Sequence, residues 1–362
     1  MAVTLDDIAK KAKVSVTTVS RVLNSKNKKY RISDETQKRV LKAAGMLHYR
    51  PNELARGLRL KKTHTIGLIV PDISNPFFAS VTRIIQTSAY KLGYSLIVCN
   101  TDENIKTEVE QVELLRSKGI DGFIIMPVGV YSKHIQALIA DQVPFVLLDR
   151  SFDDIKINSV VVDNYSGAYN AIEHLVKYGH RRIAIIQGLA NTYTNNARVK
   201  GYMDVLTSYG IPIDQKLIVG KDFRKENGYV ETKLLLNLEN PPTAIFTSSD
   251  LITLGALQAI MEEELNIPDD ISLVAFDDTE FAPFLVTPLT SVNQPKELMG
   301  EISVKILIED IRAKGKMEKK RITLKPELII RKSVRPIAGP QSMINKVEEN
   351  SLGVNLLSGE KQ

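Results

Sequence analysis

From residue 64 to about residue 293, short apolar runs alternate with longer amphipathic stretches, and this alternation limits the fold more than any other feature. The apolar runs are TIGLIV, SLIVCN, DGFIIM and PFVLLD, then SVVVD, RRIAII, TAIFTS and SLVAFD. Helical stretches lie near residues 78–92, 105–118, 131–141, 166–178, 194–209, 225–237 and 250–264. Buried strands that alternate with helices form parallel sheets covered on both faces, so we expect an α/β fold with two doubly wound parallel-sheet lobes.

The end of this region predicts a return of the chain between the lobes. Gln294 is followed by a helical stretch, PKELMGEISVKILIEDIRAK, and then by the late strands in RITLKPELIIRKSV. We expect the helix to rejoin the first lobe and the last strand to join the second. The N-terminal lobe then comprises residues 62–162 and 294–324, and the C-terminal lobe comprises 163–293 and 325–335. Three crossovers would make a hinge between closing lobes.

Charged residues are distributed unevenly along the chain. Residues 1–62 contain 16 Lys and Arg against 5 Asp and Glu, whereas the other 300 residues contain 32 against 37. A basic head on a mildly acidic body predicts a module for a polyanion joined to a module with another task.

The basic head, residues 1–50, has the pattern of a helix-turn-helix. TLDDIAKKAKVSVTTVSRVLN reads as two short helices with a turn at Lys13-Val14, and a third helix begins after Ser33. Thr4 and Ser15 are suitable N-caps. The outward residues of the second helix suit base edges in a major groove, and they are Val16, Thr17, Thr18, Ser20, Arg21 and Asn24. The alternative is a three-helix bundle whose charges are merely solvated.

Residues 51–61 predict a short hinge helix. Pro51 ends the preceding helix, Asn52 can cap the next one, and Gly57 weakens it. A helix of about two turns is marginal in water, so we expect it to form only when another contact stabilises it. The alternative is a plain interdomain linker.

Polar and aromatic residues follow the predicted strands of both lobes. Parallel strands present their carboxyl ends at one edge of a sheet, so these residues should face each other across a cleft. The strand-end candidates are Asn75, Phe77, Phe78, Asp149, Arg150, Arg198, Asp222, Phe223, Ser249, Asp250, Asp277, Asp278 and Gln294. Such a set suits a sugar, because aromatic rings pack on its C–H face and charged groups hydrogen-bond its hydroxyls. Individually, Asp149 and Arg150 could instead pair with each other, and Phe77 or Phe78 could belong to the core.

The strings VTLDDIAKKAKVSVTTVSRVLN and ISDETQKRVLKAAGMLHYRPNELARGLR resemble the DNA-binding head of the lactose/galactose repressor (LacI/GalR) family. The resemblance continues to about Val334, where the body is similar to periplasmic sugar-binding proteins, most closely the ribose-type binders. It implies that nine of the strand-end candidates contact the sugar: Asn75, Phe77, Phe78, Asp149, Arg150, Arg198, Phe223, Asp277 and Gln294. It also implies that Leu58 wedges between base pairs of the minor groove, with Asn52, Ala55 and Arg59 beside it. Two departures stand out. Ser25–Arg31 is about three residues longer than usual, and Ser249 replaces a common Asn. The shorter hydroxyl of Ser249 would widen the site or shift the sugar, which argues against ribose in particular.

The resemblance implies a ligand-responsive, sequence-specific DNA-binding transcriptional regulator, expected to be a repressor of carbohydrate-related genes. Its effector would be a monosaccharide or a sugar derivative, and a homodimer would bind double-stranded operator DNA. By family analogy alone, a phosphorylated carrier protein is a further partner. The alternatives are an enzyme or a sugar receptor on the same fold. The sequence has no phosphate-loop, G-x-G-x-x-G, H-E-x-x-H or G-x-S-x-G motif, so we predict no catalytic residue, metal or cofactor.

The remaining features concern location and the C-terminus. No apolar run is long enough to span a bilayer, the N-terminus has no signal-peptide core, and Cys99 is the single cysteine. These features predict a cytoplasmic protein without a membrane partner. Residues 336–362 have no sustained heptad and contain Gly353 and Gly359, so we expect a loosely ordered tail.

Overall fold

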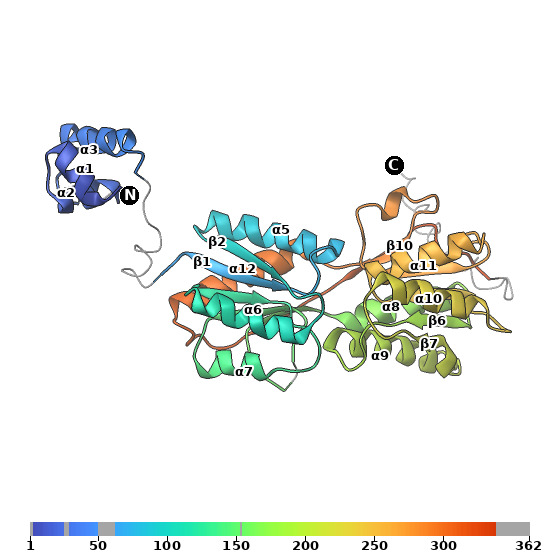
Figure 1. Ribbon diagram of the computed structural model, residues 1–362. Coiled ribbons are helices and arrows are strands. Elements are labelled where there is room, and N and C mark those ends of the chain that lie inside the picture. The colour runs from blue at the N-terminus through green and yellow to red at the C-terminus, as the bar shows by residue number, and fades with distance from the viewer. Residues whose placement is uncertain (1–2, 25–28, 50–61, 153, 338–362) are drawn as a thin grey trace, which may run out of the picture. The chain divides into compact units, whose positions relative to one another are not determined.

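The computed structural model describes residues 3–24, 29–49, 62–152 and 154–337 (Figure 1). The chain divides into two compact units, Met1–Thr63 and His64–Gln362, which are described separately below as the head and the body. Four predicted DNA-contacting residues lie outside the described ranges: Asn52, Ala55, Leu58 and Arg59. Residues 338–362 of the predicted tail also lie outside them.

The head contains three helices, α1 (Leu5–Ala12), α2 (Val16–Leu23) and α3 (Asp34–Met46). Thr4, Ser15 and Ser33 cap them, each side chain accepting a backbone N–H of the first turn. The turn between α1 and α2 is closed by Lys13 in the left-handed conformation, φ 52°. The predicted helix-turn-helix arrangement and its caps are therefore confirmed.

The core of the head is small. Apolar side chains of all three helices meet in it, and the buried ones are Ile8, Ala9, Ala12, Val19, Val22, Val40, Ala43 and Ala44. Leu41, on the other side of α3, is 56% exposed. With so few buried side chains, each large one carries a substantial part of the stability of the head.

In the first lobe of the body, six parallel strands form a sheet in the order β11-β5-β4-β3-β1-β2. The strands are β1 (Thr65–Val70), β2 (Ser95–Asn100), β3 (Gly122–Ile125), β4 (Phe145–Asp149), β5 (Ser159–Val162) and β11 (Arg321–Leu324). Four helices cover the sheet, α5 (Pro76–Lys91), α6 (Ile105–Ser117), α7 (Lys133–Ala140) and α12 (Lys296–Arg312). Separate apolar clusters lie under α5 with α12 and under α6 with α7, so both faces are buried (Figure 1).

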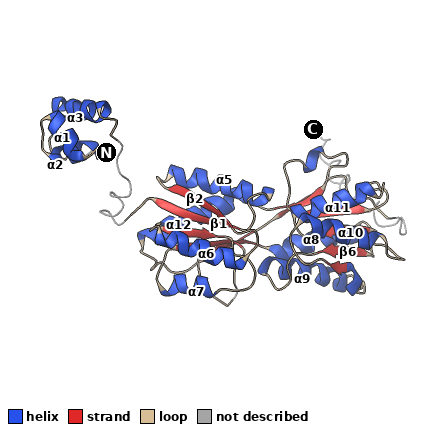
Figure 2. Ribbon diagram, in the orientation of Figure 1, coloured by secondary structure: helices blue, strands red, loops and turns tan. Residues whose placement is uncertain are grey.

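The second lobe repeats this plan with strand order β12-β10-β9-β8-β6-β7. Its strands are β6 (Ile183–Ile186), β7 (Ile218–Val219), β8 (Ala244–Thr247), β9 (Ser272–Phe276), β10 (Thr290–Asn293) and β12 (Glu327–Ile329). Its helices are α8 (Asn164–Lys177), α9 (Tyr193–Ser208), α10 (Lys225–Leu236) and α11 (Asp250–Glu262), with short 3-10 turns at Gln215–Leu217 and Ala282–Phe284. Helices lie on both faces of the sheets (Figure 2). The expected α/β fold is confirmed.

Two strands depart from the sequence prediction. SLIVCN was expected to be buried, but β2 lies at the edge of its sheet, and Ile97 and Val98 are exposed. A strand at the edge of a sheet lies at the rim of the helices that cover the sheet. The apolar run in the sequence does not show whether a strand is central or at an edge. The other exception is β12, which pairs with β10 in the antiparallel direction.

The chain passes between the two sheets three times. It crosses from β5 to the second lobe, returns after β10 through α12 to β11, and crosses again to β12. α12 packs against α5 and β4 of the first lobe. None of the helices in the described part of the chain is long and apolar enough to cross a membrane.

Truncating Ile8 tests whether the head unfolds as a separate unit. Ile8 is fully buried, so Ile8→Ala should destabilise the head by about 2–5 kcal/mol. We expect calorimetry of the full-length protein to show a weakened or lost head transition and an unchanged body transition. Leu41→Ala, which truncates an exposed side chain of α3, is the matched control and should change neither. An equal shift of both transitions in Ile8→Ala would contradict the division into two units.

Candidate functional site

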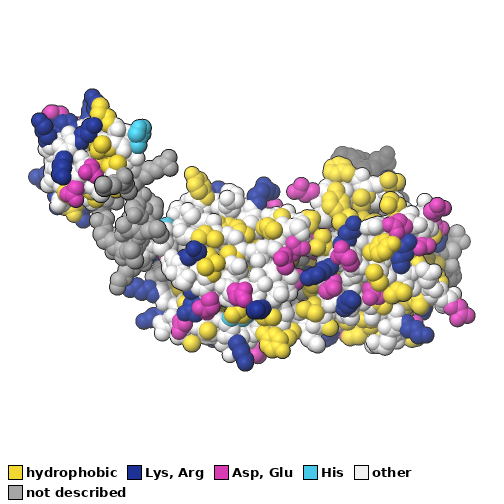
Figure 3. Space-filling view, in the orientation of Figure 1, with side chains coloured by type: hydrophobic (Ala, Val, Ile, Leu, Met, Phe, Trp, Pro, Cys, Tyr) yellow, Lys and Arg dark blue, Asp and Glu magenta, His cyan; other side chains and the backbone are white. Residues whose placement is uncertain are grey.

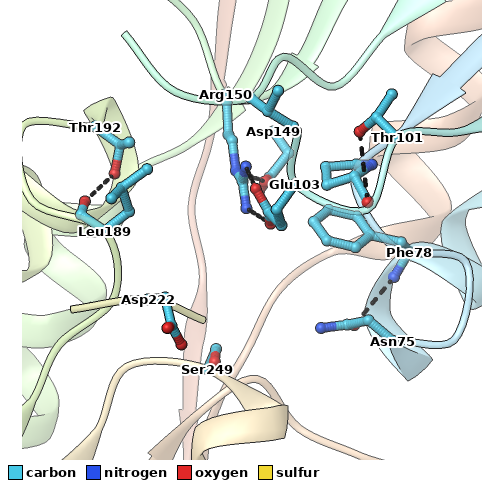
Figure 4. Close-up of polar contacts among 12 residues, drawn as sticks. Asn75, Phe78, Thr101, Glu103, Asp149, Arg150, Leu189, Thr192, Asp222 and Ser249 are labelled. Atoms are coloured by element: carbon cyan, nitrogen blue, oxygen red, sulfur yellow. Dashed lines mark hydrogen bonds and ion pairs between the residues drawn. The ribbon is translucent and has the colours of Figure 1, made fainter. Parts of the chain in front are cut away.

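One cavity between the lobes of the body collects most of the strand-end candidates. Ten of them line it: Asn75, Phe77, Phe78, Asp149, Arg150, Arg198, Phe223, Ser249, Asp277 and Gln294. Thr194 is an eleventh lining residue. In Figure 4, Asn75, Phe78, Asp149 and Arg150 of the first lobe face Asp222 and Ser249 of the second.

Asn75 shapes the rim of the first lobe. It is the N-cap of α5, and its side-chain oxygen accepts the backbone N–H groups of Phe77 at 2.8 Å and Phe78 at 3.4 Å. The cap fixes the first turn of the helix and therefore the two aromatic rings, which meet edge to face with centroids 5.2 Å apart. Pro76, which follows the cap, suits the first position of a helix.

Arg150 follows β4 and has its principal partner elsewhere in the same lobe. Its two terminal nitrogens donate to the Glu103 carboxylate at 2.7 and 2.6 Å, whereas its Nε lies 3.8 Å from Asp149 (Figure 4). The pairing of Asp149 with Arg150 that the sequence left open is thus present as a longer ion pair, while Glu103 is the nearer partner of Arg150. Burial alone would lower the pKa of Arg150, but the Glu103 carboxylate raises it above its ordinary value.

The Arg150 guanidinium lies near aromatic rings of both lobes. Its central carbon is 5.7 Å from the centroid of Phe78 and 5.1 Å from that of Phe223. Gly188 allows Phe223 to take this position, because a Cβ on residue 188 would lie 2.1 Å from the ring. Two rings from opposite lobes thus flank one planar group, an arrangement that also suits the flat faces of a sugar ring.

Arg198 and Asp277 supply the charges of the second lobe. The buried Arg198 donates to Asn164 at 2.8 Å and to the Ser248 carbonyl, and its guanidinium stacks on Phe276 at 3.6 Å. Burial lowers the pKa of Arg198. Asp277, directly after β9, accepts a hydrogen bond of 2.5 Å from the Gln294 amide nitrogen. Each of the two charged side chains is thus held at the cleft by residues of its own lobe.

Two oxygen atoms of the cavity residues have no donor in the structure. They are Asp149 Oδ1 and Gln294 Oε1, and both atoms are buried. Buried polar atoms are nearly always hydrogen-bonded in native proteins, so these acceptors point to a ligand that brings donors. Hydroxyl groups are such donors.

Burial of Asp149 has an electrostatic cost. Desolvation raises the pKa of Asp149 to about 6, although Arg150 and Arg198 act in the opposite direction. Asp149 also has a positive φ of 66°, which is uncommon outside glycine. A costly charge and an unusual backbone conformation at one residue are typical of a functional site.

Asp250 connects the lobes directly. One carboxylate oxygen accepts a hydrogen bond of 2.8 Å from the Asn75 side chain, and the other accepts the Phe77 backbone N–H at 3.2 Å. The carboxylate of α11 thus caps α5 of the opposite lobe. Burial and the neighbouring Asp277 charge raise the pKa of Asp250. Any widening of the cleft at this point must break these two bonds.

Sequence reasoning missed Glu103 and Thr194 as site residues, and it placed Asp250 at a strand end without assigning it a contact. Glu103 lies three residues after β2, so the rule of strand ends could have found it as well. Thr194 lies in the first turn of α9, where no strand end indicated it.

A second hollow of about 260 Å³ adjoins the cavity and shares Phe77 and Asp277 with it. Asp250, Glu280, Phe281 and Lys296 contribute to its wall. In the described part of the chain, no group of three or more His, Cys, Asp or Glu side chains is arranged to hold a metal ion.

The candidate DNA-reading face lies on α2 of the head. Val19 and Val22 turn into the core, which leaves Val16 and Thr17 exposed and Thr18, Ser20 and Arg21 partly exposed. Thr4, Ser15 and Asn24 are engaged locally: the first two cap helices, and the Asn24 amide donates to the Ser20 carbonyl at 2.6 Å. The head also carries Lys and Arg side chains over the face seen in Figure 3.

The helix-turn-helix head, the two-lobed body and its cleft define a class of protein, the transcriptional regulators with a periplasmic-type sugar-binding domain. Two family models match the chain. "Bacterial regulatory proteins, lacI family" covers residues 4–52, and "Periplasmic binding proteins and sugar binding domain of LacI family" covers residues 63–332. The chain belongs to the LacI family of bacterial regulatory proteins.

Individual relatives agree with this assignment. The HTH-type transcriptional regulator DegA of Bacillus subtilis is 36% identical over 93% of this chain and 99% of its own. A lac repressor dimer bound to operator and the anti-inducer ONPF is 30% identical, with a TM-score of 0.80, over 92% of this chain and 100% of its own. A LacI family regulator from Enterococcus faecium with bound ribose is 32% identical, with a TM-score of 0.68, over 76% of this chain and 100% of its own.

Neutralising Asp149 should stabilise the ligand-free protein at high pH. The folded pKa of about 6 exceeds the unfolded value of about 4, so the cost of the buried charge is absent below pH 4 and complete above pH 6. We expect Asp149→Asn to raise the unfolding free energy by up to about 3 kcal/mol at pH 8 and by only about 1 kcal/mol at pH 4.5.

Denaturant unfolding at the two pH values measures this effect. Asp269→Asn, at an exposed position of the same body, is the control and should show no such pH dependence. A loss of stability in Asp149→Asn at pH 8 would show that the Asp149 charge is compensated in the folded state.

Proposed function

We propose that the cleft binds a monosaccharide of the ribose type and that this ligand controls operator binding by the head. One observation carries the proposal. The eleven residues that line the cavity supply aromatic rings from both lobes, two guanidinium groups, and two buried oxygens that lack donors. A polyhydroxylated ring matches each of these, because it has apolar C–H faces and hydroxyls that both donate and accept.

Support for the ribose class comes from the Enterococcus faecium relative, whose solved structure contains ribose. Ser249 is the position where this chain departs from the usual Asn. Its side chain accepts the Ile252 backbone N–H at 3.4 Å as the cap of α11, and its hydroxyl is shorter than an amide. The adjoining hollow would accommodate a substituent, so a pentose derivative is compatible with the same site.

The cross-lobe contact of Asp250 offers a route from ligand to DNA. The space open to water inside the cavity is about 30 Å³, so a sugar ring requires side chains or lobes to move. Movement at the rim changes the contacts of Asp250 with Asn75 and Phe77, and with them the relative position of the lobes. The ligand shifts this equilibrium only if it binds one arrangement more tightly than the other.

Exposed apolar side chains support a homodimer. In the first lobe they include Tyr90, which is 81% exposed, with Ile97 and Val98 of the uncovered edge strand; in the second they include Leu254 and Phe284. Hydrophobic side chains appear over both lobes in Figure 3. The lac repressor in the solved complex is a dimer. Two copies would place two recognition helices in successive major grooves of a near-palindromic operator.

The other elements of the proposal follow from the class. The relatives are transcriptional regulators, so we propose a regulatory rather than a catalytic protein. We expect it to act as a repressor and to be located in the cytoplasm. The minor-groove role of Leu58 and the phosphorylated carrier protein stay predictions. The basic head should make operator binding depend steeply on salt.

A thermal-shift assay with Asp277→Ala tests the effector site. D-ribose and other monosaccharides should raise the melting temperature of the wild-type body, and Asp277→Ala should lose that rise while operator binding without ligand is kept. At a ligand concentration of 100 times Kd, the lost stabilisation is about 2.7 kcal/mol. Asp269→Ala is the control. A rise that survives in Asp277→Ala would place the ligand elsewhere.

A charge at the apolar surface tests the dimer. Leu254→Asp should weaken the association of two copies, because an aspartate buried in an apolar interface would be desolvated without a partner. Sedimentation would then show monomers at concentrations where the wild type is a dimer. Tyr131→Asp, at an exposed apolar position outside the proposed surface, should leave the dimer intact. Dimers of Leu254→Asp with wild-type affinity would exclude this surface.

A further inference from the structure

Tyr30 lies against the recognition helix from outside it. The Arg21 guanidinium of α2 stacks over the Tyr30 ring, with its central carbon 3.9 Å from the ring centroid. The Lys29 ammonium is 5.9 Å from the same centroid. Tyr30 remains 41% exposed, so the ring is not a core side chain that happens to touch Arg21.

The backbone beyond Tyr30 is tied to the third helix. The Gln37 amide donates to the Ile32 carbonyl at 2.9 Å, and Ser33 caps α3. Ile32 packs against the core of the head. The ring is therefore presented to Arg21 by a segment anchored on α3, and it belongs to Ser25–Arg31, the stretch that is longer than usual for the family.

Stacking leaves the hydrogen-bonding groups of Arg21 available. The ring covers one face of the guanidinium, whereas the N–H donors lie in its plane and point outward at the edge. Within residues 3–24 and 29–49, no carboxylate forms an ion pair with Arg21. A long, flexible side chain held against a ring loses less freedom when it forms a bidentate contact with guanine O6 and N7.

We propose that Tyr30 is a positioning residue that holds Arg21 for base reading and so sets the base preference at one position of each operator half-site. This inference rests on the proposed base-reading role of Arg21. Tyr30 would then contribute to sequence specificity through Arg21, without a base contact of its own.

In vitro selection from a randomised DNA library, with the full-length wild-type protein, first defines the preferred site. Binding to that site and to its single-base variants is then measured for Arg21→Ala, Tyr30→Ala, Tyr30→Phe and the double variant Arg21→Ala/Tyr30→Ala. Leu41→Ala, at an exposed position of α3, is the matched control, and the melting temperature of each head confirms folding.

Arg21→Ala should reduce discrimination at one half-site position by about tenfold or more. Tyr30→Ala should reduce it at the same position by about two- to fivefold, with non-specific affinity unchanged. Tyr30→Phe, which keeps the ring, should behave as wild type, and the double variant should be no worse than Arg21→Ala alone.

Each other outcome overturns the proposal in a distinct way. Equal loss on all DNA sequences would make Tyr30 a phosphate contact, and loss at a different position would make it a base contact. An unchanged Tyr30→Ala would make the stacking incidental while leaving the role of Arg21 intact. If Arg21→Ala changes no base preference, the base-reading role itself fails, separately from that of Tyr30.

Discussion

The two parallel sheets bury both of their faces, and the arrangement of the body follows from this constraint. Strands such as β1, β4 and β9 have almost wholly apolar, buried side chains, so charged or polar functional side chains are not placed along them. Their carboxyl ends are where charged residues can begin. Asp149 and Asp277 occupy those positions on opposite lobes, and the chain crosses between the sheets three times, which keeps the two edges opposed.

The cleft thus gathers charges that oppose one another. Asp149, Asp250 and Asp277 lie near the buried Arg150 and Arg198. Burial raises the pKa values of Asp149 and Asp250. Part of the charge is compensated within each lobe, by Glu103 on Arg150 and by Gln294 on Asp277. The part that is not compensated, including two oxygens without donors, is what a polyhydroxylated ligand would satisfy. Stability and binding are therefore opposed at this site.

Local signals predicted most of the elements and, together with the family resemblance, ten of the eleven residues that line the cavity, all but Thr194. Helix caps such as Thr4, Ser15 and Ser33 lie within three residues of the groups they bind, so they are visible in the sequence. The rule of strand ends placed Asn75, Asp149 and Asp277 at one cleft because it depends only on strand direction. The exposure of β2 could not be predicted in this way, since an edge strand has the same apolar run as a central one.

The sequence by itself determined the class of fold, the basic head and most of the residues at the cleft, because each depends on periodicity, charge and neighbours close in the chain. Tertiary structure alone decided which partner each charged group takes. Arg150 pairs with Glu103, 47 residues away, rather than chiefly with adjacent Asp149; Asp250 bonds Asn75 across the cleft; and Tyr30 stacks on Arg21. Such contacts depend on distances between elements that are far apart in the chain, and no local pattern encodes those distances.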